Sequence, residues 1–163
     1  MFLVKDDVVS DKFKNSLTKL FQSNKLNYTF STRATENEDG GFHFIHDIYS
    51  NNKRKKTYKF FKSLVTDILD KQNISFNKIH RMAINITFNN GNVKEVPLHI
   101  DHTFPHNQII LYLNDADGDT VIPKYNASIS PLMNRAIIFE GIEHKHYFPT
   151  KGVRIVFVCT FSL

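Results

Sequence analysis

The second half of the chain is a succession of short apolar runs separated by turn signals, and this feature limits the fold more than any other. From Lys78 onward no apolar stripe has helical spacing, so strands are expected there rather than helices. The expected strands are residues 81–88, 96–101, 108–113, 120–122, 135–140 and 153–161. The turns expected at 89–92 and 115–119 contain glycines that we predict at positive φ.

Two amphipathic helices are expected in the first part of the chain. Apolar residues recur at helical spacing between Phe13 and Phe21, and Ser10 with Asp11 can cap that helix. Residues 57–71 carry a second apolar stripe, whereas the polar stretch 31–41 has no periodicity and is expected as a loop. Two helices followed by many strands predict a mainly β sandwich or barrel with a helical buttress on one face.

Length and composition fit a single domain, 1–163, with helical support and a loop in 1–75 and the β core in 78–163. Hydrophobic residues make up 41% and charged residues 23%, which argues against disorder. Cys159 is the only cysteine and is expected as a buried, inert thiol. The apolar start is too short for a signal peptide or a membrane span, so a cytoplasmic location without a membrane partner is expected.

A candidate metal site begins with His99 and Asp101. On a strand, residues i and i+2 face the same side, so this imidazole and carboxylate would lie together. A third ligand must come from elsewhere, and His144 or His146, after the expected strand 135–140, can supply it. Two histidines and one carboxylate leave about three metal positions open, as in non-haem iron(II) oxygenases.

Arg154 stands early in the last expected strand, within an otherwise apolar run. A guanidinium in such a place needs a buried anion to offset its desolvation, and a ligand carboxylate is an economical partner. We expect Arg154, Val156, Val158 and Thr160 on one face of that strand, towards a pocket. Ile155, Phe157, Cys159 and Phe161 are expected on the other face, towards the helices.

The second half of the chain resembles the 2-oxoglutarate- and iron(II)-dependent oxygenase superfamily, and its layout is most similar to the prolyl 4-hydroxylase-like branch with its small phage and bacterial members. The resemblance covers about half of the chain, from residue 80 to the end. An ordered set of motifs carries it: Pro97 to His102, Ile109 to Asn114, Asp117 to Thr120, Asn134-Arg135, Phe139 to Gly141, His144, Pro149, and Arg154 to Phe161. The resemblance implies a double-stranded β-helix, a jelly-roll or cupin-like fold.

The resemblance also implies the cofactors and their ligands. Iron(II) would be held by His99, Asp101 and His144, and His144 is preferred to His146 because Pro149 and Arg154 follow it at the family's spacing. The far carboxylate of 2-oxoglutarate would be bound by Arg154. O2 would be the second co-substrate, with ascorbate as a supporting reductant, and the products would be succinate, CO2 and a hydroxylated substrate.

One position departs from the family pattern. Some relatives have a serine two residues after the arginine, and this chain has Val156 there. Another group must then assist Arg154. Tyr112 and, as a weaker candidate, Asn85 are the residues that we expect to bind the co-substrate beside it.

The substrate class stays open between a peptide or protein side chain, slightly favoured by the resemblance, a nucleobase of the demethylase type, and a small metabolite. The alternatives to an enzyme are a non-catalytic binding module of the same fold and a non-oxidative cupin-type protein. The net charge of +5 favours anionic partners, and the basic run 53–56 would be the place for nucleic acid. His102 and His106 flank the expected site and could support the ligands or face the substrate, but solvated loop histidines are the favoured interpretation.

Overall fold

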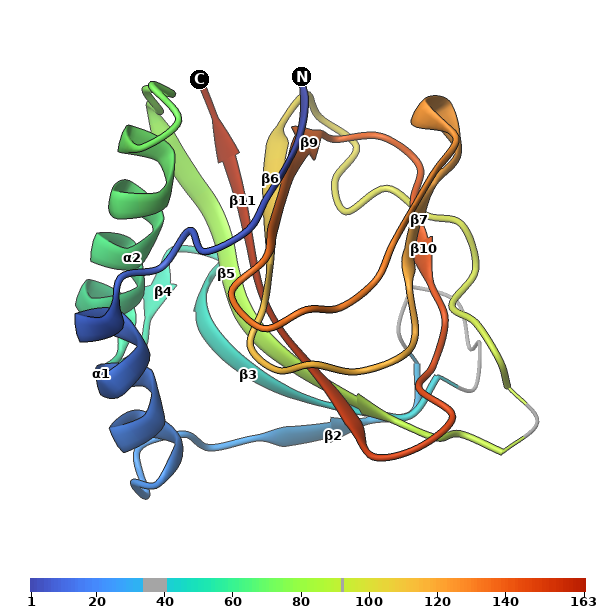
Figure 1. Ribbon diagram of the computed structural model, residues 1–163. Helices are drawn as coiled ribbons and strands as arrows, with labels where there is room; N and C mark the ends of the chain where they lie inside the picture. The colour runs from blue at the N-terminus through green and yellow to red at the C-terminus, as the bar shows by residue number, and fades with distance from the viewer. Residues whose placement is uncertain (34–40, 92) are drawn as a thin grey trace.

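The computed structural model describes residues 1–33, 41–91 and 93–163, which form two facing β-sheets with two helices on one outer side (Figure 1). The helices are α1 (Asp11–Phe21) and α2 (Tyr58–Asp70), with a 3-10 turn at Pro123–Tyr125. The strands are β1 (Phe2–Lys5), β2 (Thr29–Ser31), β3 (His43–Ser50), β4 (Lys53–Arg54), β5 (Lys78–Phe88), β6 (Asn107–Tyr112), β7 (Thr120–Ile122), β8 (Ala127–Ile129), β9 (Ala136–Glu140), β10 (Lys145–His146) and β11 (Val153–Ser162).

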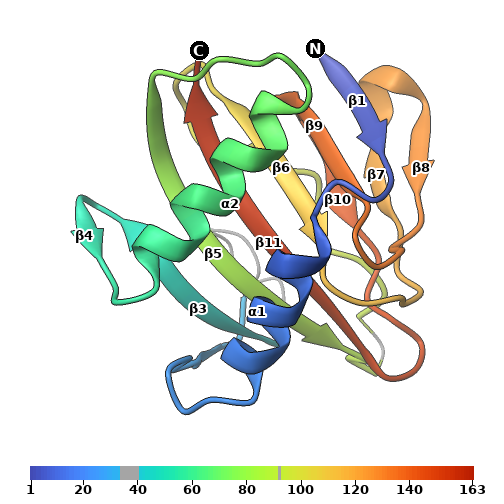
Figure 2. The same cartoon turned by 60° about the vertical axis from the view of Figure 1, so that its left-hand side comes forward.

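The larger sheet has the order β1-β9-β6-β11-β5-β3-β2, with β4 paired to β3, and the smaller sheet has the order β10-β7-β8. Every pair is antiparallel. The smaller sheet lies across from the larger one, on the side away from the helices (Figures 1 and 2). This arrangement confirms the predicted jelly roll with a helical buttress.

The main core lies between the helices and the larger sheet. The apolar stripe of α2 is fully buried there, and the ring of Phe61 stacks on that of Phe157 in β11 with 5.1 Å between centroids. Ile155, Cys159 and Phe161 belong to the same core, which confirms the face predicted for the helix side of β11. Burying such side chains contributes about 1.5–3 kcal/mol each, which makes this layer the main source of stability.

A second, smaller core lies between the two sheets. Val156 and Val158 of β11 pack there with Tyr112 of β6, Ile122 of β7 and Phe139 of β9. The alternate residues of β11 therefore face the inter-sheet space, as predicted. This core closes one part of that space, and the rest remains open as the cavity described below.

Several elements differ from the prediction. Residues 96–101 do not form a regular strand: His99 makes an isolated bridge to His144, and Pro97 has no amide donor for a strand ladder. The strands β1, β2 and β3 were not predicted, since their half-polar patterns are weak without knowledge of the partner strand. Ser10 occupies the N-cap position of α1, but its side chain makes no capping hydrogen bond.

Both glycines in the predicted turns have positive φ, 63° at Gly91 and 95° at Gly118. At Gly118 a Cβ atom would lie 2.5 Å from the carbonyl oxygen of Tyr147, so this turn also needs glycine for space. Residues 34–40 of the expected loop and residue 92 of the first turn lie outside the described residues. Among the described residues, no helix is long and apolar enough to cross a membrane.

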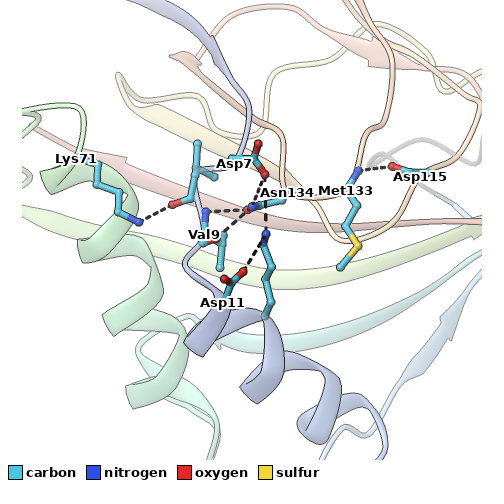
Figure 3. Close-up of polar contacts among 9 residues, drawn as sticks. Asp7, Val9, Asp11, Lys71, Asp115, Met133 and Asn134 are labelled. Atoms are coloured by element: carbon cyan, nitrogen blue, oxygen red, sulfur yellow. Dashed lines mark hydrogen bonds and ion pairs between the residues drawn. The ribbon is translucent and has the colours of Figure 1, made fainter.

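The segment between β1 and α1 is fixed by Asn134 and Lys71 (Figure 3). The Asn134 side chain accepts a hydrogen bond from the Val9 amide at 2.7 Å and donates to the Val9 carbonyl at 3.1 Å and to Asp7 at 3.3 Å. Lys71 at the end of α2 donates to the Val8 carbonyl at 2.9 Å. These contacts connect the first helix, the second helix and the larger sheet.

Candidate metal centre and adjoining cavity

His99, Asp101 and His144 each present one ligand atom, and the three atoms lie within 4.8 Å of one another. His99 and Asp101 belong to the irregular segment before β6, and His144 stands between β9 and β10. The backbones of His99 and His144 exchange two hydrogen bonds of 3.0 Å, which places their rings 4.5 Å apart. A single backbone bridge therefore joins residues that are 45 positions apart in the sequence.

The imidazole orientations suit metal binding. Nδ1 of His99 lies 2.9 Å from the Pro97 carbonyl, and Nδ1 of His144 lies 3.0 Å from the Ile142 carbonyl. An Nδ1–H donated to each carbonyl leaves the Nε2 lone pair available for a metal ion. Gln108 adds a contact, with its Nε2 3.3 Å from Nε2 of His144.

The protonation states also fit a divalent cation. Burial alone would raise the pKa of the Asp101 carboxyl, but its electrostatic surroundings, Arg81 among them, lower that pKa by more, so the carboxyl stays ionised. Burial lowers the pKa of His144 and favours its neutral, ligating form. Two neutral imidazoles and one carboxylate can hold a divalent metal ion and leave about three positions open.

A cavity of about 360 Å³ adjoins these three residues and extends between the sheets to Arg154. Arg154 is 2% exposed, and its Nη2 donates to Thr120 Oγ1 at 2.8 Å. Its Nε has no hydrogen-bond partner among the described residues, and its Cζ lies 5.4 Å from the centroid of the Tyr112 ring. A buried guanidinium with an unsatisfied N–H fits a bound carboxylate, which accepts two parallel hydrogen bonds.

The two residues expected to assist Arg154 have different places. The Tyr112 hydroxyl is 2.7 Å from Thr120 Oγ1 and 3.2 Å from the Ile129 carbonyl, so its hydrogen bond orients the Thr120 side chain. Asn85 on β5 lines the cavity, and its buried Oδ1 has no partner. Thr120 Oγ1 accepts a hydrogen bond from Arg154 at 2.8 Å, and the Tyr112 hydroxyl also interacts electrostatically with the guanidinium. Thr120 was not among the residues predicted to assist Arg154.

His146 lies beside Arg154 rather than with the convergent ligand atoms. It pairs with Thr120 across β10 and β7, lines the cavity, and its buried Nε2 has no partner. Burial and the nearby charge of Arg154 hold its pKa well below the usual value, so the ring is neutral. Sequence reasoning considered His146 only as a metal ligand, although its spacing of two from His144 already placed both side chains on one face.

His106 is buried and His102 is half-buried, whereas both were expected as solvated loop histidines. Nε2 of His102 lies 2.8 Å from Thr160 Oγ1, and its ring stacks on Phe104. His106 is 6% exposed and packs against Gly141, where a Cβ atom would lie 2.2 Å from the ring. The two rings are 4.9 Å apart, so this segment forms a packed aromatic layer next to the candidate ligands.

Comparison with known proteins identifies the fold. No protein-family model matches the chain, and no curated protein matches it in sequence. Among solved structures, an oxidoreductase of the 2OG-Fe(II) oxygenase family from Burkholderia pseudomallei superposes with a TM-score of 0.71 at 11% identity, over 99% of this chain and 84% of that one.

Two prolyl hydroxylases are also similar. One, from Trichoplax adhaerens in complex with a hypoxia inducible factor oxygen degradation domain peptide fragment, has a TM-score of 0.64 at 14% identity over 99% and 83% of the two chains. The other, a viral collagen prolyl hydroxylase from Paramecium Bursaria Chlorella virus-1 in its 2OG complex, has a TM-score of 0.63 at 11% identity over 99% and 96%. The chain shares the fold of these oxygenases over its whole length.

Proposed function

We propose that this protein is an iron(II)- and 2-oxoglutarate-dependent oxygenase that hydroxylates its substrate. The single observation that carries the proposal is the convergence of His99, Asp101 and His144 in a cavity that the buried Arg154 also lines. The fold shared with 2OG-Fe(II) oxygenases supports it independently.

The cofactors suit the residues present. Bound iron(II) would supply the oxidative decarboxylation of 2-oxoglutarate to succinate and CO2, coupled through O2 to hydroxylation of the substrate. The chain contributes the facial ligand set, with His99 and His144 fixed in the Nε2-ligating form by two backbone carbonyls. Ascorbate would serve as an external reductant.

Arg154, Thr120 and His146 would bind the far carboxylate of 2-oxoglutarate. Arg154 offers the unpartnered Nε–H, Thr120 is held next to it by Tyr112, and His146 adds a neutral imidazole with a free Nε2. The apolar side chains of Val156 and Val158 line the same cavity and keep water from the chelated end. These residues therefore orient the co-substrate with its keto-acid end towards the metal ligands.

A peptide or protein side chain is the substrate class that the comparisons favour, since one structural neighbour is a prolyl hydroxylase in complex with a peptide fragment. A nucleobase or a small metabolite could also present a C–H bond to the metal ligands, so these two substrate classes fit the same chemistry. The basic run 53–56, which would contact nucleic acid, lies at β4 on an exposed edge of the larger sheet.

The test is turnover together with metal binding. Purified protein with iron(II), 2-oxoglutarate and ascorbate should form succinate slowly without substrate, and calorimetry should detect cobalt(II) binding. Asp101→Ala and His144→Ala should abolish both signals, whereas His146→Ala should retain metal binding. The exposed Asp70→Ala serves as the matched carboxylate control.

Absence of both succinate formation and metal binding in the unaltered protein would refute the oxygenase proposal and leave a binding module. Succinate release stimulated by a peptide library, but not by oligonucleotides, would support the favoured substrate class. Stimulation by oligonucleotides alone would replace it.

A further inference from the structure

Arg81 places a second guanidinium in the cavity, close to the candidate metal ligands. The pairing of β11 with β5 shifts so that Thr160 faces Arg81 while Phe161 faces Ile79, which leaves His80 as the extra residue of a bulge. Bulges often redirect side chains near functional sites. Here Arg81 lines the cavity on the same face as Asn85 and Thr87.

The Arg81 guanidinium makes no hydrogen bond or ion pair with any described residue. Asp47 is the nearest carboxylate by strand register, since it pairs with Ala83 two residues along β5, but it forms no ion pair with Arg81. Asp101 interacts electrostatically with Arg81, but the two side chains form no ion pair within 4.0 Å. A partly buried arginine without a counterion is unfavourable unless a ligand supplies one.

When a metal ion and 2-oxoglutarate are bound, the charges in the cavity do not balance the positive charge of Arg81. Among the described residues that line the cavity, Asp101 is the one carboxylate, against the guanidiniums of Arg33, Arg81 and Arg154. The charges of a divalent ion, the Asp101 carboxylate, a 2-oxoglutarate dianion and Arg154 cancel. The positive charges of Arg33 and Arg81 then remain, and Arg81 is the one that lies close enough to Asp101 to affect its pKa.

We infer that the substrate carries an oxyanion, a carboxylate or a phosphate, which the Arg81 guanidinium binds in a bidentate manner next to the oxidised carbon. This inference rests on the proposed function. A guanidinium suits this task because its planar fork matches both oxyanions. With a cavity of about 360 Å³ already holding 2-oxoglutarate, the group that enters is small, so its charge sits close to the reacting position.

A purely structural role for Arg81 would be to orient Asp101. That role predicts weaker metal binding when Arg81 is replaced, whereas the substrate role predicts unchanged metal and 2-oxoglutarate binding. The two roles therefore separate without turnover.

The experiment uses the full chain loaded with zinc(II) and 2-oxoglutarate, which blocks the Arg154 end and cannot turn over. Acetate, inorganic phosphate and neutral acetamide are titrated while the NMR signal of the Arg81 Nε–H group is followed. Acetate or phosphate should shift this signal and acetamide should not. The anion that binds more tightly indicates whether the substrate carries a carboxylate or a phosphate. Arg81→Met should weaken anion binding by about tenfold or more while changing zinc(II) affinity by less than about twofold.

Asp47→Asn and Arg54→Met are the matched controls, and both should leave anion binding unchanged. Three results would overturn this inference and leave the proposed function standing. They are the absence of an anion-specific shift, anion binding by Arg81→Met equal to that of the unaltered protein, and loss of zinc(II) affinity in that variant. Failure of zinc(II) and 2-oxoglutarate to bind the unaltered protein would overturn the proposed function and this inference together.

Discussion

His146 illustrates how much one buried side chain can contribute to a ligand site. It faces Thr120 across two short strands, and its Nε2 and the Nε of Arg154 both lack partners. Two adjacent unsatisfied polar atoms in a buried place are costly, and one bound carboxylate would satisfy both.

We therefore predict that His146→Val raises the KM for 2-oxoglutarate by about 10- to 100-fold, the effect of losing one hydrogen bond to a charged group. His146→Gln, which keeps a donor, should recover most of the affinity. The measurement is succinate formation at varied 2-oxoglutarate, with cobalt(II) affinity as the control for the neighbouring metal ligand. A reduced kcat at unchanged KM would contradict this role.

Cys159 lies on the helix side of β11, fully buried, and burial raises the pKa of its thiol far above the ordinary value. The thiolate is the reactive form, so we predict that the native protein does not react with a thiol reagent at neutral pH. Full reaction should follow unfolding in denaturant. Rapid labelling of the native protein would show that this strand opens locally.

At the scale of elements, Asn134 joins the segment before α1 to the strand β9. Its backbone is in the left-handed region at φ 70°, and its side chain satisfies both polar groups of Val9. We predict that Asn134→Ala lowers the free energy of unfolding by about 2 kcal/mol, because it leaves buried backbone groups unpaired. For a chain of this length the corresponding decrease in Tm is about 6 °C.

Asn126→Ala is the matched control for that substitution. Asn126 also has a left-handed backbone, at φ 47°, but it is exposed and its side chain does not bridge to Val9 as that of Asn134 does. Its loss should cost less than about 1 kcal/mol. Equal effects of the two substitutions in urea unfolding would show that backbone conformation, not the side-chain bridge, stabilises the fold.

The turn before β7 is joined to the turn before β11 by Asp117. Its carboxylate accepts hydrogen bonds from the hydroxyl and from the amide of Thr150, the latter at 2.9 Å, and these bonds hold the pKa of Asp117 below its usual value. A carboxyl with a lowered folded-state pKa stabilises the protein above its unfolded-state pKa. That stabilisation is lost as the pH falls through the folded-state pKa.

Stability measured by urea unfolding should accordingly decrease as the pH falls from about 5 to about 3, and Asp117→Asn should make this decrease shallower. The exposed Asp70→Asn should leave the pH dependence unchanged. An unaltered slope in the Asp117 variant would exclude this contact as a source of acid sensitivity.

At the scale of the whole molecule, the candidate metal centre connects parts that the rest of the fold holds loosely. His99 and Asp101 lie in an irregular segment attached to the smaller sheet by single bridges, and His144 precedes β10 of that sheet. A bound ion would therefore fasten this segment to the rest of the molecule.

We predict that zinc(II) at about 100 times its Kd stabilises the protein by about 2.7 kcal/mol, and that Asp101→Ala abolishes the effect. Hydrogen exchange should slow in residues 97–106 on metal binding and stay unchanged in α2. Uniform protection of both regions would point to a general effect instead of a local ligand site.

Elements with strong periodicity and residues with distinctive chemistry could be predicted from the amino-acid sequence. The stripe of α2, the two faces of β11 and the glycine turns follow from local patterns, because helical and strand periodicities act within a few residues. The set His99, Asp101, His144 and Arg154 could be proposed because its spacing and its cost of burial are both visible in the chain.

Contacts between groups that are distant in the sequence could not be predicted in this way. The bridge between His99 and His144, the contact of Thr120 with Arg154 and the free guanidinium of Arg81 all depend on strand register between segments far apart in sequence. The strand β3, the half-buried His102 and the buried His106 were missed for the same reason, since a half-polar pattern shows its buried side only when its neighbours are known. The local sequence determines the chemical properties of a residue, and long-range strand pairing determines which residues it contacts.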